Sequence, residues 1–543
     1  MRFSRLALAL AFGASPAWAQ PAAGEPPAET PKDPPKESPK GSADEKPVEP
    51  QSSKPVPIEV PQVRTVTQPE VSPTAEKAEE EDLDLDNYHA KDRGFRFGSY
   101  GRVLAGSDLR GGKPQKVSIV AHGPRIVEDS YLELEFSYGF ERQAGSGGAN
   151  SYIIVRPIVT LAFAGTLFHD TGQFDAQPAL RNMFLDGQVG DHLTLWVGSR
   201  MYRGDDIYLF DYWPLDDINT VGGGLMYKRD IMLRHDADGA ATADSVEIAG
   251  HIGFNRLNNP FQFQEVEVAN PVQGATTVEQ LNRQRTVASA SAAYVMMPTG
   301  AGIGAKLKVH GEFHSLPSGT FKRMDGTLQA LPSDTGFLIG AELGAFGFSD
   351  DSRFRRHLNL FTRYAKGLAA FDELAPPTSF GADLKTGRAN EFTFGISGNW
   401  DTKFANMMVG VLSRRFVDAD EDTVDSDDGW EYAVDARPLV RVPTTDFFVG
   451  GDISYQSRFP RGLNNITLKA EDPAVFQIAP MLTWSPMGPS SYDRPQIRLV
   501  YRAAYLNDAA LDQYVPDDPR HSHKLVHFLG LQAEWWFNSS TYR

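Results

Sequence analysis

Short segments in which apolar and polar residues alternate follow one another from about residue 95 onward. In SYLELEFSY, residues 130–138, the leucines and Phe136 fall on one face, whereas Tyr131, Glu133 and Glu135 fall on the other. Side chains alternate with a period of two in a β-strand, while a helix would mix the two sets. The pattern therefore predicts a strand with one apolar and one polar face.

The C-terminal stretch FLGLQAEWWF, residues 528–537, repeats this alternation. Trp535 and Phe537 share a face with the leucines, and Glu534 and Trp536 share the other. Similar stretches, separated by clusters of Gly, Asp, Asn and Pro that favour turns, occur at residues 151–165, 192–202, 245–254, 392–400 and 447–457. So many strands predict one large closed antiparallel sheet of roughly 16 to 18 strands.

Which face is apolar separates a membrane barrel from a soluble one. Glutamates and arginines lie opposite the leucines, next to aromatic residues, which favours an outer-membrane barrel whose apolar face contacts lipid and whose polar face lines water. The chain has 33 Phe, 18 Tyr, 8 Trp and no cysteine, and it contains no apolar run long enough for a membrane-spanning helix. A secreted soluble all-β protein is the alternative.

Residues 1–94 differ in composition from the rest. Residues 1–19 predict a signal peptide, with Arg2 and Arg5 ahead of a short apolar run and small residues before the expected cleavage site. Residues 20–94, rich in Pro, Glu and Lys, predict a largely disordered periplasmic tether or spacer. Whether this tether contacts peptidoglycan or a periplasmic protein is left open by its sequence. The net charge of −17 argues against a general nucleic-acid binder.

Aromatic and charged residues on the face that lines the lumen indicate which class of solute the predicted pore conducts. Trp536 is predicted to face the lumen, and Tyr100 with Arg102 and Tyr131 with Glu133 pair an aromatic ring with a charge on the same side. Aromatic faces stack on sugar rings, and charged groups bind sugar hydroxyls. An alternative interpretation is that these are girdle aromatics and charges that set the field in a pore.

Several segments, in order, resemble the maltoporin family of sugar-selective outer-membrane porins. WVGSRMYRGDDIYLFDYWPLDD, residues 196–217, resembles the family's third loop region. FGSYGRVLAG and PRIVEDSYLELEF resemble its first two strands, ARPLV resembles a late strand, and DRPQIRLVYRAAYL followed by FLGLQAEWWF resembles its last two strands. The resemblance covers residues 95–537.

This resemblance implies an 18-stranded barrel in the outer membrane, a homotrimer, and a third loop folded inward to narrow the channel. It implies passive diffusion of malto-oligosaccharides or related sugars, with no catalysis and no cofactor. The matching slide aromatics are Tyr100, Tyr131, Phe174 and Trp536. The matching polar-track residues are Arg102, Arg125, Glu133 and Arg181. The matching constriction residues are Asp206, Asp211, and Tyr212 or Trp213.

The sequence departs from the family pattern at several positions. Phe174 or Gln173 stands where the family has a slide tryptophan donated by a neighbouring subunit, and Gly204, beside Arg203, stands where it has a constriction arginine. A late slide tryptophan aligns with Glu431, with Trp430 one residue away. The usual loop disulfide is absent because the chain has no cysteine.

Other functions remain as alternatives at this point. A general or anion-selective porin would share the barrel without depending on aromatics, and a barrel hydrolase or a surface adhesin would need other features. The histidines of residues 521–527 are compatible with a metal site but favour a solvated loop. The carboxylates of residues 416–430 are compatible with calcium but favour an acidic extracellular loop, because the spacing lacks a full calcium-loop motif.

Overall fold

The fold is an all-β barrel, seen here in a computed structural model. The predicted signal peptide and most of the tether lie outside the residues that the structure describes. The structure describes residues 93–143, 152–164, 178–235, 241–255, 263–270, 274–281, 283–298, 302–323, 325–349, 354, 356–371, 377–422 and 425–538.

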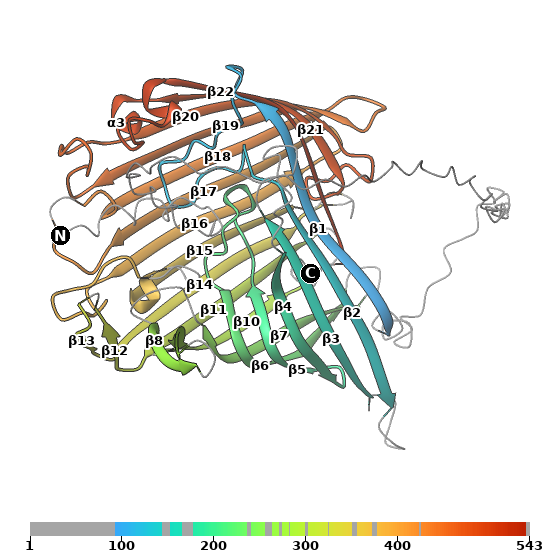
Figure 1. The fold of residues 1–543 in the computed structure, drawn as a ribbon. Helices are drawn as coiled ribbons and strands as arrows, with labels where there is room; N and C mark the ends of the chain where they lie inside the picture. The colour runs from blue at the N-terminus through green and yellow to red at the C-terminus, as the bar shows by residue number, and fades with distance from the viewer. Residues whose placement is uncertain are drawn as a thin grey trace, which may run out of the picture. The chain divides into compact units, whose positions relative to one another are not determined.

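Eighteen antiparallel strands form one sheet, and pairing of β1 with β22 closes it (Figure 1). Closure leaves no unpaired strand edge, and the predicted 18-stranded barrel is confirmed. The strands are β1 (Gly94–Ser107), β2 (Tyr131–Gln143), β3 (Tyr152–Ala164), β4 (Pro178–Val189), β5 (Leu193–Arg203), β6 (Asp217–His235), β7 (Ala241–Asn255), β10 (Arg285–Met296), β11 (Ile303–Leu316), β14 (Asp334–Gly347), β15 (Arg356–Gly367), β16 (Asn390–Asp401), β17 (Ala405–Val417), β18 (Gly429–Arg441), β19 (Phe447–Pro460), β20 (Ala474–Trp484), β21 (Gln496–Leu506) and β22 (Leu525–Phe537).

Two further hairpins and several short helices lie in the loops. The hairpins, β8 (Phe263–Asn270) with β9 (Gly274–Leu281) and β12 (Gly319–Lys322) with β13 (Leu328–Leu331), lie at the same end of the barrel as α3 (Asp508–Leu511) (Figure 1). The 3₁₀ helices are η2 (Tyr208–Phe210), η3 (Leu368–Ala370) and η4 (Pro519–Ser522). No helix among the described residues has the length and apolar character needed to cross a membrane.

The two ends of the barrel differ in the length of their connections. At the end opposite the added hairpins, residues 190–192 join β4 to β5 and residues 402–404 join β16 to β17. Outer-membrane barrels place short turns on the periplasmic side and long loops outside the cell. We call the two ends the short-turn end and the long-loop end.

The apolar face of the sheet points outward. Leu531 and Phe537 are 53% and 45% exposed, whereas Glu133 and Glu534 are 1% and 4% exposed. Since these residues alternate along their strands, the exposed apolar side chains cover the outside, and the polar ones point into the barrel. This arrangement matches a barrel in lipid and not a soluble barrel with a dry centre.

Two loops fold into the interior. The first loop, residues 108–130, and the third loop, residues 204–216, both start from the long-loop end. Ile119 and Ile207, one from each loop, are fully buried and belong to one apolar cluster with Phe361, which projects inward from β15. The loops therefore pack on each other and on the inner wall, and they narrow the lumen.

Candidate functional site

Three aromatic residues form a continuous row on the inner wall, which we call the aromatic row. Tyr131 of β2, Tyr100 of β1 and Trp536 of β22 follow one another, with ring centroids 5.9 Å apart for the first pair and 6.5 Å apart for the second. Tyr100 lies directly opposite Trp536 in the strand register, and their rings are stacked. These are three of the four predicted slide aromatics; Phe174 lies outside the described residues.

A β-bulge positions Arg181, one of the predicted polar-track residues. Thr160 of β3 pairs with Asn182 of β4, but Leu161 pairs with Leu180, so Arg181 has no partner opposite it. A bulge of this kind redirects a side chain. The Arg181 guanidinium donates to the Tyr131 hydroxyl at 2.6 Å and forms an ion pair with Glu133, to which Tyr131 also donates.

The other predicted polar residues lie further along the aromatic row. Arg102 pairs with Glu128 at 3.0 Å and with Asp211 at 3.5 Å. Arg125 pairs with Glu128 at 2.8 Å and with Glu534 at 3.2 Å. Each arginine thus shares carboxylates from more than one element, and a solute hydroxyl can replace one partner while another remains.

The third loop reaches this cluster through a tight turn. Ile207 pairs with Tyr212 as an isolated bridge around η2, and Asp211 adopts a left-handed conformation with φ of 52°. Aspartate tolerates this region better than most residues. The turn brings the Asp211 carboxylate back toward Arg102 of β1 and Arg125 of the first loop.

Tyr208, at the start of η2, is a candidate that sequence reasoning missed. Its ring lies edge-on to Trp536 at 6.3 Å, and the Arg125 guanidinium lies 4.6 Å from its centroid. Its hydroxyl donates to Glu534 Oε2 at 2.6 Å. Tyr208 is therefore the aromatic residue of the third loop that contacts the aromatic row.

The two aromatics predicted for the constriction lie elsewhere in the third loop. Tyr212 is 4% exposed and stacks on His122 of the first loop at 3.9 Å. Trp213 is 6% exposed and lies under the Arg203 guanidinium, 3.6 Å from its ring centroid. Both are buried in packing between the loops and the wall, and their contact with a solute stays a prediction.

Gly204 stands where the maltoporin pattern has an arginine, and the geometry explains the glycine. A Cβ atom at this position would lie 1.8 Å from Asp216 Oδ1, so any side chain would displace the Asp216 carboxylate, which is buried and paired with Lys308. The neighbouring Arg203 pairs with Asp217 at 2.8 Å. At the base of the third loop, the Asp216 carboxylate thus occupies the space beside Gly204, and Arg203 is paired with Asp217.

The two predicted constriction carboxyls differ in their protonation. Burial inside the barrel raises the pKa of Asp206 to about 7, and Asp211 and Asp205 add to the rise. Partial desolvation also acts on Asp211, whose side chain is 36% exposed, but Arg125, Arg102 and Arg203 outweigh it and lower the pKa of Asp211 to about 2. Asp211 is therefore ionised at neutral pH, whereas Asp206 titrates there.

Glu534, next to Trp536 on the inner face of β22, forms ion pairs with several arginines. Arg494 and Arg498 both lie 2.9 Å from Glu534 Oε2, and Arg125 approaches its other oxygen. The alternation of Glu534 with Trp536 could have indicated a lumenal glutamate from the sequence. The arginines come from distant segments, and no periodic signal links them to it.

A second charged array, which we call the ionic ladder, crosses five consecutive strands from β15 to β19. Neighbouring groups are separated by 2.5, 2.7, 3.4 and 3.1 Å in turn. Its members, in strand order, are Arg363, Glu391, Arg414, Glu431 and Arg458.

The ionic ladder also holds both inward loops. The Ala121 backbone amide donates to Glu431 at 3.1 Å, and Arg363 donates to the Pro214 carbonyl at 3.3 Å. Glu431, at the aligned position of a late slide tryptophan, is thus a wall residue that anchors the first loop. Trp430 stacks on Tyr432, a residue that is 37% exposed on the outer face.

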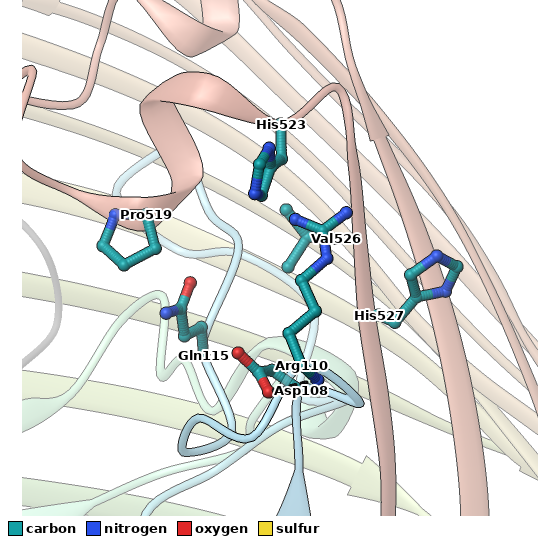
Figure 2. A pocket seen from close by; sticks show the side chains of 7 residues that line it. All are labelled: Asp108, Arg110, Gln115, Pro519, His523, Val526 and His527. Carbon is teal, nitrogen blue, oxygen red and sulfur yellow. Dashed lines mark hydrogen bonds between the residues drawn. The ribbon is translucent and has the colours of Figure 1, made fainter.

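The two metal hypotheses receive different support. A pocket of about 180 Å³ at the long-loop end includes His523 and His527 among its lining residues (Figure 2). Among the described residues, the three-ligand group close enough for one ion is Asp418, Asp425 and Asp427, so no such group includes these histidines. The sequence favours an acidic extracellular loop over calcium binding at these residues, and that preference stays a prediction.

No curated protein matches the chain in sequence. Among solved structures, it is similar to the outer-membrane channel DcaP of Acinetobacter baumannii, with 8% identity, a TM-score of 0.36 and coverage of 82% of this chain and 98% of the other. It is also similar to OpdL of Pseudomonas aeruginosa, with 8% identity, a TM-score of 0.39 and coverage of 82% and 99%.

The match to a protein family is more extensive. The model of the family described as LamB porin matches residues 95–537, which are the whole of the barrel from β1 to the end of β22. The resemblance to maltoporins is thereby confirmed, together with the outer-membrane location and a role in permeation rather than catalysis. The chain belongs to the LamB porin family and is an outer-membrane channel.

Proposed function

We propose that this channel conducts malto-oligosaccharides or related sugars by passive diffusion. The observation that carries the proposal is the aromatic row, in which Tyr131, Tyr100 and Trp536 follow one another along the inner wall. Tyr131 and Trp536 are half-buried, whereas Tyr100 between them is 3% exposed and supports their rings. Sugar rings stack on such a row, while their hydroxyls exchange partners with the charged side chains beside it. The family supports a sugar as the solute.

Weak sites in series suit a passive channel. Flux requires that a solute bind well enough to enter and weakly enough to leave. Arg102 and Arg125 each pair with more than one carboxylate. A sugar hydroxyl can therefore replace one carboxylate while the arginine stays paired with another. Arg181 and Glu133 serve the same exchange beside Tyr131.

The family also supports a homotrimer, which we include in the proposal. The signal peptide of residues 1–19 and the tether of residues 20–94 remain predictions from the sequence. A general or anion-selective porin is the competing function, and it predicts that sugars do not block the ion current.

The test is ion conductance through single channels in a planar bilayer, titrated with maltose, sucrose and longer oligosaccharides. Sugars are expected to block the current, and Trp536→Ala should weaken binding about two- to twelvefold, as expected for loss of an aromatic contact worth about 0.5–1.5 kcal/mol. Trp400→Ala is the matched control, because Trp400 is 52% exposed on the outer face. Absence of block in the unmodified channel would favour the general porin.

A further inference from the structure

One connection at the short-turn end folds into the barrel. Residues 485–495 join β20 to β21, at the end where the other connections described above are short. Ser485 and Ser490 are each 2% exposed, and Arg494 is 8% exposed. Met487 is 69% exposed, as expected of a solvated turn, so the burial places the second half of the segment, residues 490–494, inside the opening.

One side of this segment is attached to strands that are not its neighbours. Asp401, the last residue of β16, accepts from Ser490 Oγ at 2.8 Å and from the Ser491 backbone amide at 2.9 Å. Asn406 of β17 donates to the Pro489 carbonyl at 2.8 Å. Strands β18 and β19 separate β17 from β20 in the barrel, so the segment reaches across the ends of these two strands.

The other side of the segment contacts the aromatic row and the third loop. The Arg494 guanidinium lies 4.0 Å from the ring centroid of Trp536. It donates to the Tyr208 hydroxyl at 2.6 Å and to Glu534 Oε2 at 3.1 Å. The Tyr492 ring meets Tyr208 edge-on at 5.7 Å. The third loop and this segment therefore meet over the last ring of the row.

We infer that residues 485–495 form an exit gate, in which Arg494 competes with sugar for Trp536. The inference rests on the proposed sugar function. A guanidinium against an indole face is a favourable cation–π contact, and a sugar that stacks on that face must displace it. The return of Arg494 then promotes release into the periplasm.

The surroundings of Arg494 make this displacement feasible. When Arg494 leaves Glu534, the carboxylate keeps Arg498, at 2.9 Å, and Arg125, at 3.2 Å. A buried carboxylate without a partner would be costly, and these two arginines avoid that cost. Arg498 is held on β21, whereas Arg494 and Arg125 both lie on connecting segments. Of these two, Arg494 is the one whose guanidinium lies against the Trp536 ring.

The first experiment measures sugar binding by the full-length Arg494→Ala channel in planar bilayers, with maltohexaose as the probe. The binding constant should rise and the residence time lengthen about two- to thirtyfold, as expected for loss of a competing cation–π contact. Arg520→Ala is the matched control, because Arg520 lies 4.2 Å from the Tyr514 ring at the long-loop end. Unchanged or weaker binding in Arg494→Ala would overturn the competition.

Two further variants test the gate without altering the groups at Trp536. Asp401→Ala removes the attachment to β16 and should raise the ion conductance in the absence of sugar. The second replaces both Ser490 and Asp401 by cysteine in this cysteine-free chain, because the two side chains are in direct contact. Titration of free thiols first establishes that the disulfide forms, since its geometry is specific. The oxidised form should pass sugar and ions more slowly than the reduced form.

These variants separate failure of the gate from failure of the sugar function. If maltohexaose does not block the unmodified channel, the sugar function fails, while the ion conductances of Asp401→Ala and of the locked channel still report on the gate. If the oxidised and reduced forms conduct equally and Asp401→Ala matches the unmodified channel, residues 485–495 are not a gate.

Discussion

Two charged regions of the inner wall, the aromatic row with its polar residues and the ionic ladder, use similar side chains differently. In the ionic ladder, each charge meets an opposite charge on the next strand, and Glu391 has a fully buried side chain. Beside the aromatic row, the carboxylate of Asp211 is 36% exposed and lies near more than one arginine. Exposure alone does not separate the two regions, because Arg125, Glu133 and Arg181 are 6%, 1% and 7% exposed, as little as the ladder. The difference lies in connectivity: the ladder joins neighbouring strands of the wall, whereas Asp211 on the inward third loop shares its carboxylate between two arginines.

Removal of Glu391 should give the largest effect on stability. Glu391→Ala removes the shared partner of two buried arginines, Arg363 and Arg414. Loss of one member of a buried ion pair typically costs about 3–5 kcal/mol in the free energy of unfolding. Urea unfolding of the detergent-solubilised channel, followed by tryptophan fluorescence, measures this loss.

The control is an ion pair on the surface. Glu421 pairs with Arg388, and both side chains are more than half exposed, so Glu421→Ala should cost no more than about 1 kcal/mol. If Glu391→Ala were as stable as this control but lost sugar binding, the ionic ladder would be part of the solute pathway and the comparison would fail.

Truncation of Tyr208 should have a smaller effect, and on permeation rather than stability. Tyr208→Ala removes the ring that lies edge-on to Trp536 and is expected to weaken sugar binding by about 0.5–1.5 kcal/mol while raising ion conductance. Titration of single-channel current with maltohexaose measures both. Tyr212→Ala alters a ring that is packed between the loops. If this variant weakened sugar binding more than Tyr208→Ala, Tyr212 would be the constriction aromatic, as the sequence predicted.

A change of pH should have the smallest effect, confined to ion selectivity. The pKa of Asp206 is about 7, so this carboxyl is mostly neutral at pH 6 and mostly charged at pH 8. Preference for cations should therefore increase from pH 6 to pH 8, and Asp206→Asn should abolish the increase. Because the pKa of Asp211 is about 2, Asp211→Asn should shift selectivity equally at both values. Reversal potentials measured in a salt gradient at pH 6 and pH 8 report this cation preference for the unmodified channel and both variants.

The strands were predictable because alternation is a local property. Once the apolar face is assigned to lipid, the period of two also places Tyr100, Tyr131 and Trp536 in the lumen, and the structure agrees. The same reasoning puts Glu534 beside Trp536. Predictions of this kind need only the order of residues along one strand.

The inward segments were less predictable because their positions depend on distant partners. The third loop turns at Asp211 in a left-handed conformation, so no regular period shows that Tyr208, rather than Tyr212 or Trp213, contacts the row. Residues 485–495 resemble an ordinary turn in sequence. Their inward course depends on Asp401, which is remote in the chain.

The bulge in β4 adds a functional group at little structural expense. Because Arg181 stands opposite no residue of β3, Thr160 and Leu161 keep their own partners on either side of it. The extra residue changes the phase of the strand, and Leu180 and Met183 both remain on the lipid side, 51% and 55% exposed, although an odd number of positions separates them. One inserted amino acid thus supplies a cation at the Tyr131 end of the aromatic row, and the outer face of the barrel stays apolar.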